Sequence, residues 1–164
     1  IITIAGLVVV VIAAIPIAQG DHPLGALLLV LGLPLDALDG AVARAMARKD
    51  RFGGVLDSTL DRYADGIIFA ALAYFFAVRD EYVYFLLTLA ALNGSFVVSY
   101  VRARAGEADL SVKIGLFSRM ERLAVLLIMF LIPGLLIPGL ILLAVGTNIS
   151  AVQRLWYVRR HLDR

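Results

Sequence analysis

The sequence predicts an all-α integral membrane protein with six transmembrane helices. Hydrophobic residues make up 62% of its 164 residues, and the mean hydropathy is +0.93, whereas a soluble domain is nearer half apolar. A chain this short cannot bury so much apolar surface in its own core, so lipid must cover part of it. The apolar stretches lack the period-2 alternation of strands, which favours helices.

Six apolar stretches follow one another along the chain. Each has about the 20 residues that a helix needs to cross a bilayer core, and turn-forming residues such as Gly20-Asp21 and Pro133-Gly134 separate them. The stretches cover residues 1–19, 23–47, 54–78, 82–105, 117–135 and 137–158. We expect one domain over residues 1–164. Because the sequence opens inside an apolar run without an initiator Met, we also expect a segment before residue 1.

The basic residues predict the orientation of these helices. All but Arg79 flank the junction of the second and third stretches, the junction of the fourth and fifth, or the C-terminus. Cytoplasmic loops of membrane proteins are enriched in Lys and Arg. Both junctions and the C-terminus are therefore expected in the cytoplasm, and six spans return the N-terminus to the same side.

Four aspartates gather at the junction of the second and third stretches. Asp36 and Asp39 share one helix face, and Asp57 and Asp61 lie one turn apart on the next helix. A short loop, about residues 48–53, makes these helices antiparallel neighbours. Carboxylates at membrane depth repel one another unless cations offset them. Oxygen ligands favour Mg²⁺, Mn²⁺ or Ca²⁺, and four carboxylates suffice for two ions that share ligands.

Small residues lie beside these carboxylates at Gly40, Ala43 and Gly53. Two interpretations are open. Small residues permit close packing of membrane helices, and they also leave room for the phosphates or the backbone of a ligand. For Gly40 and Gly53, the position beside carboxylates favours the ligand.

These residues together resemble a family signature. The pattern Asp36-x2-Asp39-Gly40-x2-Ala43-Arg44-x8-Gly53-x3-Asp57-x3-Asp61 is similar, at every fixed position, to that of the CDP-alcohol phosphotransferases, also called phosphatidyltransferases. The resemblance implies a reaction in which an alcohol hydroxyl attacks the lipid-side phosphorus of a CDP-lipid and CMP leaves. It also implies that the N-terminal juxtamembrane helix usual in the family is missing here.

The resemblance implies roles for the signature residues. Asp36, Asp39 and Asp57 would be metal ligands, and Asp61 would be a ligand or the base that takes the hydroxyl proton. The nucleotide part of the CDP-lipid would meet Gly40, Ala43, Arg44 and Gly53. Further expectations are two Mg²⁺ or Mn²⁺ ions, a homodimer, and a multi-pass place in the cell membrane of a prokaryote with the active site facing the cytoplasm. No nucleic-acid partner is expected.

A second set of arginines indicates the acceptor alcohol. Guanidinium groups suit a phosphorylated acceptor, whereas a plain alcohol does not need several cations. Three segments, 99–107, 118–123 and 153–155, resemble the phosphatidylinositol-phosphate synthase branch of the family, with departures at Gly106 and Ser118, where that branch often has Glu. The resemblance implies that the phosphate of inositol 1-phosphate is held by Arg102, Arg119 and Arg154.

Several alternatives remain open at this stage. The acceptor is alternatively glycerol 3-phosphate or another alcohol, and the lipid is CDP-diacylglycerol or archaeal CDP-archaeol. The arginines are alternatively anchors at the membrane surface, the interpretation favoured for Arg104, Arg122, Arg159, Arg160 and Arg164. Outside this class of enzymes, an acidic membrane site is also typical of divalent-cation transporters, which would need carboxylates that reach both faces.

Overall fold

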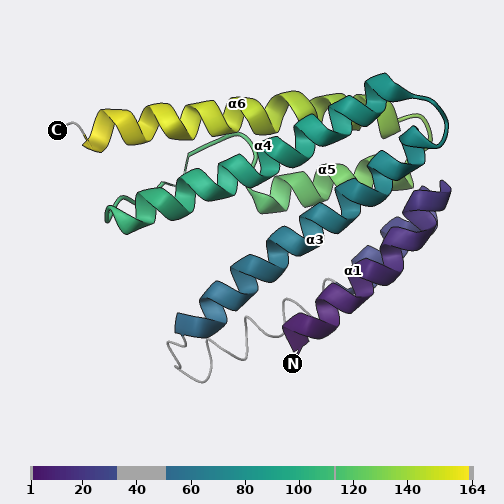
Figure 1. Ribbon diagram of the computed structural model, residues 1–164, viewed down its shortest axis with the longest axis horizontal. Helices are drawn as coiled ribbons and strands as arrows, with labels where there is room; N and C mark the ends of the chain where they lie inside the picture. The colour runs from purple at the N-terminus through teal and green to yellow at the C-terminus, as the bar shows by residue number, and fades with distance from the viewer. Residues whose placement is uncertain (1, 33–50, 113, 163–164) are drawn as a thin grey trace. The chain divides into compact units, whose positions relative to one another are not determined.

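The computed structural model describes residues 2–32, 51–112 and 114–162 (Figure 1). Within these ranges the chain forms six helices and no strand, so the predicted all-α class is confirmed. The helices are α1 Ile2–Gln19, a segment His22–Gly32, α3 Arg51–Ala77, α4 Tyr82–Glu107, α5 Arg119–Leu131 and α6 Leu136–Leu162. Each helix overlaps one apolar stretch of the sequence.

The chain divides into two compact units, Ile1–Asp80 and Glu81–Arg164. In the N-terminal unit α1 lies along α3 (Figure 1). Its core holds Ile17 from α1 and Phe69, Leu72 and Phe76 from α3, each at most 3% exposed. The three α3 residues recur at helical spacing, so a single face of α3 supplies the contact with α1.

In the C-terminal unit α4 lies along α6, and α5 packs against α6 (Figure 1). The helices α4 and α6 approach closely at Gly94, where an added Cβ would come within 2.2 Å of Thr147 Oγ1. Asn148 joins the same two helices, because its amide nitrogen donates to the carbonyl oxygen of Ala90 over 3.0 Å. Small and polar side chains of this kind typically join helices in membranes.

The helix α5 is shorter than the apolar stretch 117–135 that predicts it. It has 13 residues, or about 20 Å at the rise of an α-helix, whereas a bilayer core is about 30 Å thick. Pro133 and Gly134 end it, and Gly134 takes a left-handed conformation with φ +85°. Among the described helices, α4 and α6 are long and apolar enough to cross a membrane.

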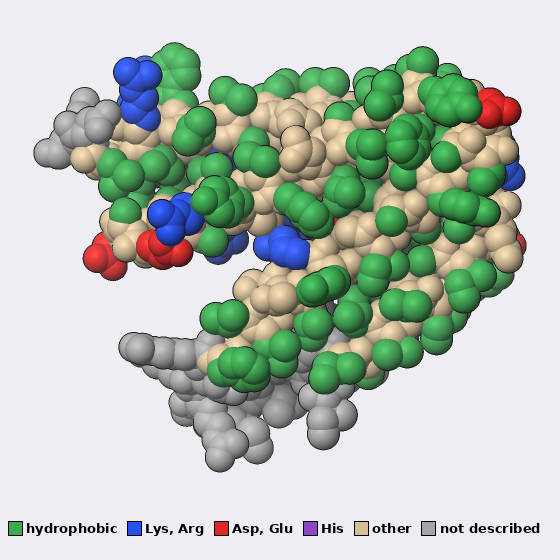
Figure 2. Space-filling model, viewed as in Figure 1, with side chains coloured by type: hydrophobic (Ala, Val, Ile, Leu, Met, Phe, Trp, Pro, Cys, Tyr) green, Lys and Arg blue, Asp and Glu red, His purple; other side chains and the backbone are tan. Residues whose placement is uncertain are grey.

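Hydrophobic side chains cover much of the surface seen in Figure 2. On α6 alone, Ile141, Leu142, Val145 and Val152 are each at least 45% exposed. Contiguous apolar surface of this extent is costly in water and suits contact with lipid. The outward faces of the helices therefore agree with the composition of the sequence.

Candidate catalytic and anion-binding residues

Two of the predicted metal ligands lie on α3. Asp57 and Asp61 are four residues apart on this helix, so they share a face about one turn apart. The Asp57 side chain is exposed, whereas that of Asp61 is only 12% exposed. Arg62 Nη2 donates to Asp61 Oδ2 over 3.5 Å, which places a positive charge beside the carboxylate at the centre of the predicted chemistry.

The remaining signature residues are only partly described. Gly53 lies in the first turn of α3 and is half-buried. Five predicted site residues lie outside the described ranges: Asp36, Asp39, Gly40, Ala43 and Arg44. Among the residues that the structure does describe, no group of three or more His, Asp or Glu side chains is placed to hold a metal ion.

The described donors fit the kind of metal that the signature predicts. Asp57 and Asp61 supply carboxylate oxygens one turn apart, which are the ligands that Mg²⁺ and Mn²⁺ prefer. The chain has no cysteine, so a thiolate-rich site for a softer metal is excluded. The two aspartates can therefore form one side of an oxygen-only site.

Arg154 is the most enclosed of the three predicted phosphate ligands. Its side chain is 4% exposed in the C-terminal unit. Its Nε donates to the carbonyl oxygen of Ile114 over 2.9 Å, and its Nη1 donates to that of Val98 over 3.0 Å. A guanidinium has five N–H groups, so these two bonds leave three for a ligand.

Further arginines approach Arg154 from α4 and α5. Arg102, exposed near the end of α4, and Arg122, buried in the first turns of α5, lie close enough to repel the charge of Arg154, and Glu121 lies close enough to attract it. Arg119 is the first residue of α5 and is half-buried. This end of the unit thus concentrates positive charge, which an anion would offset.

Arg122 is a residue that sequence reasoning missed. The anchoring interpretation does not fit it, because a surface anchor would be exposed and Arg122 is 3% exposed. Arg122 is three residues after Arg119, which puts both side chains on one side of α5. This spacing was the feature of the sequence that could have indicated a shared location. Arg104, by contrast, is exposed and pairs with Glu107, as expected of a surface residue.

The start of α5 explains one departure from the branch pattern. Ser118 is the N-cap residue of this helix. Its backbone N–H donates to the carboxylate of Glu121 over 2.9 Å, and its hydroxyl also donates to that carboxylate. Serine at the N-cap with glutamate three residues later is a common helix-start arrangement, so Ser118 has a structural role here.

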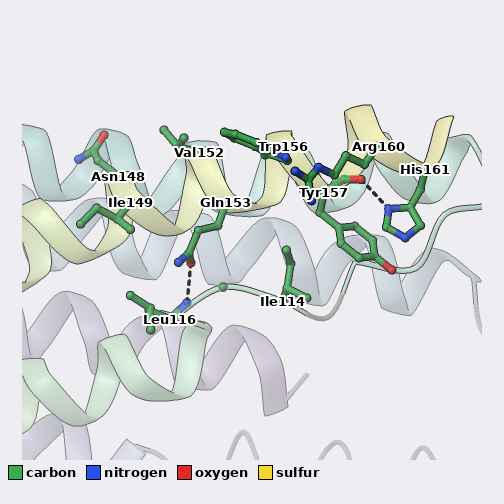
Figure 3. Close-up of a pocket in the computed structure, with 11 residues that line it drawn as sticks. Ile114, Leu116, Asn148, Ile149, Val152, Gln153, Trp156, Tyr157, Arg160 and His161 are labelled. Carbon is green, nitrogen blue, oxygen red and sulfur yellow. Dashed lines mark hydrogen bonds between the residues drawn. The ribbon is translucent and has the colours of Figure 1, made fainter. Parts of the chain in front are cut away.

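A pocket that the sequence did not predict lies between α6 and the segment 114–116 (Figure 3). Its volume is about 860 Å³. Apolar side chains of Ile149, Val152 and Trp156 line it, and Arg160 and His161 stand at one end. None of the three predicted phosphate ligands lines this pocket, so it is distinct from the arginine cluster.

Comparisons with known proteins cover both units. The family model for CDP-alcohol phosphatidyltransferases matches residues 1–156. An archaetidylinositol phosphate synthase of Methanothermobacter thermautotrophicus is 37% identical over 166 residues, which cover 98% of this chain and 83% of that protein. A phosphatidylinositol phosphate synthase of Mycolicibacterium smegmatis is 36% identical over 169 residues, which cover 97% of this chain and 76% of that protein.

The fold of the chain is also similar to solved structures. The chain is similar to the phosphatidylinositol phosphate synthase of Mycobacterium tuberculosis with CDP-DAG bound, with a TM-score of 0.90, 35% identity, and coverage of 96% of this chain and 84% of that chain. The same enzyme in complex with manganese and citrate matches with a TM-score of 0.89, 35% identity, and coverage of 96% and 80%.

Proposed function

Because the chain belongs to the CDP-alcohol phosphatidyltransferase family, we propose that it makes phosphatidylinositol phosphate. It transfers the phosphatidyl group of a CDP-lipid, either CDP-diacylglycerol or CDP-archaeol, to the hydroxyl of inositol 1-phosphate, and CMP leaves. It is thus a membrane transferase of phospholipid biosynthesis. The observation that carries the choice of acceptor is the gathering of Arg102 and Arg122 around the buried Arg154.

The acceptor's phosphate is the anion for which this cluster is suited. Arg102, Arg119 and Arg154 bind it, the last through the N–H groups that its two carbonyl bonds leave over. Charge-assisted bonds from guanidinium to phosphate are among the stronger hydrogen bonds in proteins. An unphosphorylated alcohol such as inositol or serine would offer no anion to the buried guanidinium of Arg154, whereas a phosphate would.

The carboxylates supply the other half of the chemistry. Asp36, Asp39 and Asp57 hold two divalent cations, Mg²⁺ or Mn²⁺. The structure of a similar enzyme has been solved in complex with manganese. When bound, such ions offset the diphosphate charge and stabilise CMP as a leaving group. Asp61 takes the proton of the acceptor hydroxyl or completes the ligand set. The neighbouring Arg62, whose Nη2 lies 3.5 Å from Asp61 Oδ2, places a positive charge beside this carboxylate.

The nucleotide part of the CDP-lipid lies beside these carboxylates. Gly40, Ala43 and Gly53 leave room for it, because a larger side chain at these positions would occupy the space next to the aspartates. Arg44 pairs with the diphosphate or with a signature carboxylate. This arrangement follows the family signature and the half-buried position of Gly53 in α3.

The surroundings of the site follow from the family and the charge pattern. We propose a single six-span domain in the cell membrane of a prokaryote, with both termini and the active site on the cytoplasmic side. The apolar helices α4 and α6 and the one-sided distribution of basic residues support this orientation. We further propose a homodimer, as the family resemblance implies.

Release of CMP with a panel of acceptors tests the proposal. Purified protein is given CDP-diacylglycerol and Mg²⁺ or Mn²⁺, together with inositol 1-phosphate, inositol, glycerol 3-phosphate or serine. We expect turnover with inositol 1-phosphate and none with inositol or serine. Turnover with an unphosphorylated alcohol alone would contradict the phosphate role of the arginines, and turnover with glycerol 3-phosphate alone would reassign the acceptor while retaining that role.

A further inference from the structure

The segment 114–117, which leads into α5, is attached to one face of α6. Three α6 side chains make the attachment: Ser150, Gln153 and Arg154. They recur at helical spacing and so point to the same side of the helix. We call these three residues the clasp.

Each clasp residue bonds to a backbone group of the segment. Arg154 Nε donates to the carbonyl oxygen of Ile114 over 2.9 Å. The N–H of Leu116 donates to Gln153 Oε1 over 3.3 Å, a contact drawn in Figure 3. The N–H of Phe117 donates to Ser150 Oγ over 2.9 Å, and this last bond is buried.

The Ser150 hydroxyl has a defined orientation. It donates to the carbonyl oxygen of Gly146 over 2.8 Å, so its proton points back along α6. Its lone pairs are then directed away from the helix, where the N–H of Phe117 meets them. A hydroxyl already committed as donor to its own helix acts here as a fixed acceptor for the segment.

Gly115 makes the approach of Arg154 possible. Its φ is +121°, a conformation that side chains rarely adopt. A Cβ there would also lie 3.0 Å from Arg154 Nε. The guanidinium cannot move aside easily, because it is bonded to Ile114 and, on α4, to Val98.

The clasp lies directly before the start of α5. Phe117, which Ser150 holds, is two residues before Arg119, the first residue of the helix. Between them Ser118 is held by Glu121. Arg119 is therefore connected to α6, which carries Arg154, through a short series of bonds to backbone groups.

We infer that Ser150 and Gln153 are positioning residues for the phosphorylated acceptor, acting with the two backbone bonds of Arg154. They hold the start of α5 so that Arg119 and Arg154 face the same phosphate. The inference rests on the proposed function, because it assumes that these arginines bind the acceptor. It assigns to Ser150 and Gln153 a role in acceptor affinity and none in binding the CDP-lipid.

The test compares Ser150→Ala with Thr147→Val in the full-length protein. Thr147 is a matched control: it lies one turn earlier on α6, is fully buried, and bonds only within its helix, to the carbonyl oxygen of Leu143. For both variants the Michaelis constants for the phosphorylated acceptor and for CDP-diacylglycerol are measured, together with thermal unfolding. We expect Ser150→Ala to raise the acceptor constant about tenfold while the CDP-diacylglycerol constant changes less than about twofold. Thr147→Val should change neither.

Equal changes in both constants, or no change in the acceptor constant, would overturn the inference. Should Ser150→Ala unfold, Gln153→Leu serves instead, because Gln153 is exposed and its replacement removes only the bond to Leu116. The acceptor is whichever phosphorylated alcohol supports turnover of the unaltered protein. Lack of turnover with inositol 1-phosphate contradicts the proposed acceptor. An unaltered Michaelis constant for the acceptor in the variants contradicts the positioning role of Ser150 and Gln153. Turnover with unphosphorylated alcohols alone would overturn both.

Discussion

The ring of Phe117 lies against the backbone of Gly146 in α6. A methyl group added at Gly146 would come within 2.2 Å of the ring atom Cε2, and the ring is itself buried. We predict that Gly146→Ala destabilises the protein by about 1–3 kcal/mol, as overpacking of a filled interior does. The loss should exceed the gain of up to about 1 kcal/mol that alanine brings to a helix. Thermal unfolding in detergent measures the difference.

Gly6→Ala is the matched control for this change. Gly6 is also a helical glycine, in α1, but an added Cβ there meets nothing within 4 Å. Alanine at this position should leave stability unchanged or raise it by up to about 1 kcal/mol. Equal unfolding temperatures for the two variants would show that Phe117 does not occupy the space beside Gly146.

Replacement of Asp61 by asparagine should separate catalysis from binding. Asparagine keeps the size of the side chain and can still accept a bond from Arg62, but it cannot take a proton from the acceptor hydroxyl. We predict that Asp61→Asn lowers kcat by about 100- to 10,000-fold, the usual contribution of a general base, while the protein still binds the CDP-lipid. Initial rates of CMP release and calorimetric binding of the CDP-lipid report the two effects.

Asp80→Asn is a suitable control, because Asp80 lies in the exposed turn before α4 at a positive φ of 59° that asparagine tolerates. It should turn over at the rate of the unaltered protein. Full activity of Asp61→Asn would remove Asp61 from the chemical step.

Loss of the Arg119 charge should affect one substrate. A hydrogen bond to a charged group contributes about 1.5–3 kcal/mol, which corresponds to roughly 10- to 100-fold in affinity. We predict that Arg119→Gln raises the Michaelis constant for inositol 1-phosphate by that factor and leaves the constant for the CDP-lipid near its original value. Arg159→Gln, an exposed change in the last turn of α6, should alter neither. A similar rise in both constants for Arg119→Gln would count against an acceptor site at the start of α5.

His22 predicts a pH dependence of stability. It lies outside the predicted spans, as the first residue of the helical segment His22–Gly32, where its ring meets that of Phe75 at 4.5 Å between centroids. Burial, and then the charge of Arg79, lower the pKa of His22 below its ordinary value of 6.5, although Asp21 opposes this. The unfolded chain therefore binds a proton at His22 more readily than the folded protein does. The contribution of His22 to stability is fully present above about pH 6.5 and is lost as the pH falls from there through the lower pKa of the folded state.

The comparison of the native protein with His22→Leu measures this contribution. Unfolding temperatures are recorded in detergent from about pH 5 to pH 8, a range that includes the ordinary histidine pKa. The unaltered protein should lose more stability than the variant on the acidic side. Parallel curves for the two proteins would exclude His22 as the source.

Much of the fold could be predicted from the sequence because helix ends carry local signals. Gly20, in the left-handed conformation with φ +97°, ends α1 where the turn residues predict. The end of α5, at Leu131, lies four residues before the predicted end at residue 135, because Pro133 and Gly134 follow it and cannot continue the helix. Its start was placed too early, because the apolar Phe117 reads as part of a helix while its N–H is in fact bonded to Ser150.

The site could be predicted only where the chemistry depends on residue type and spacing. The interval between Asp57 and Asp61 places both on one helix face, and α3 bears this out. The two carbonyl bonds of Arg154 could not be foreseen, because every residue has a carbonyl group and Val98 and Ile114 carry no distinguishing side chain. The burial of Arg122 likewise depends on the packing of α5, which the sequence of α5 alone does not contain.

A competition between the two phosphorylated acceptors tests which alcohol the protein uses. The protein is given CDP-diacylglycerol with equal concentrations of inositol 1-phosphate and glycerol 3-phosphate, and the lipid products are identified by mass spectrometry. We predict that phosphatidylinositol phosphate dominates and that the amount of CMP formed equals the amount of lipid product. Phosphatidylglycerophosphate as the main product would contradict it.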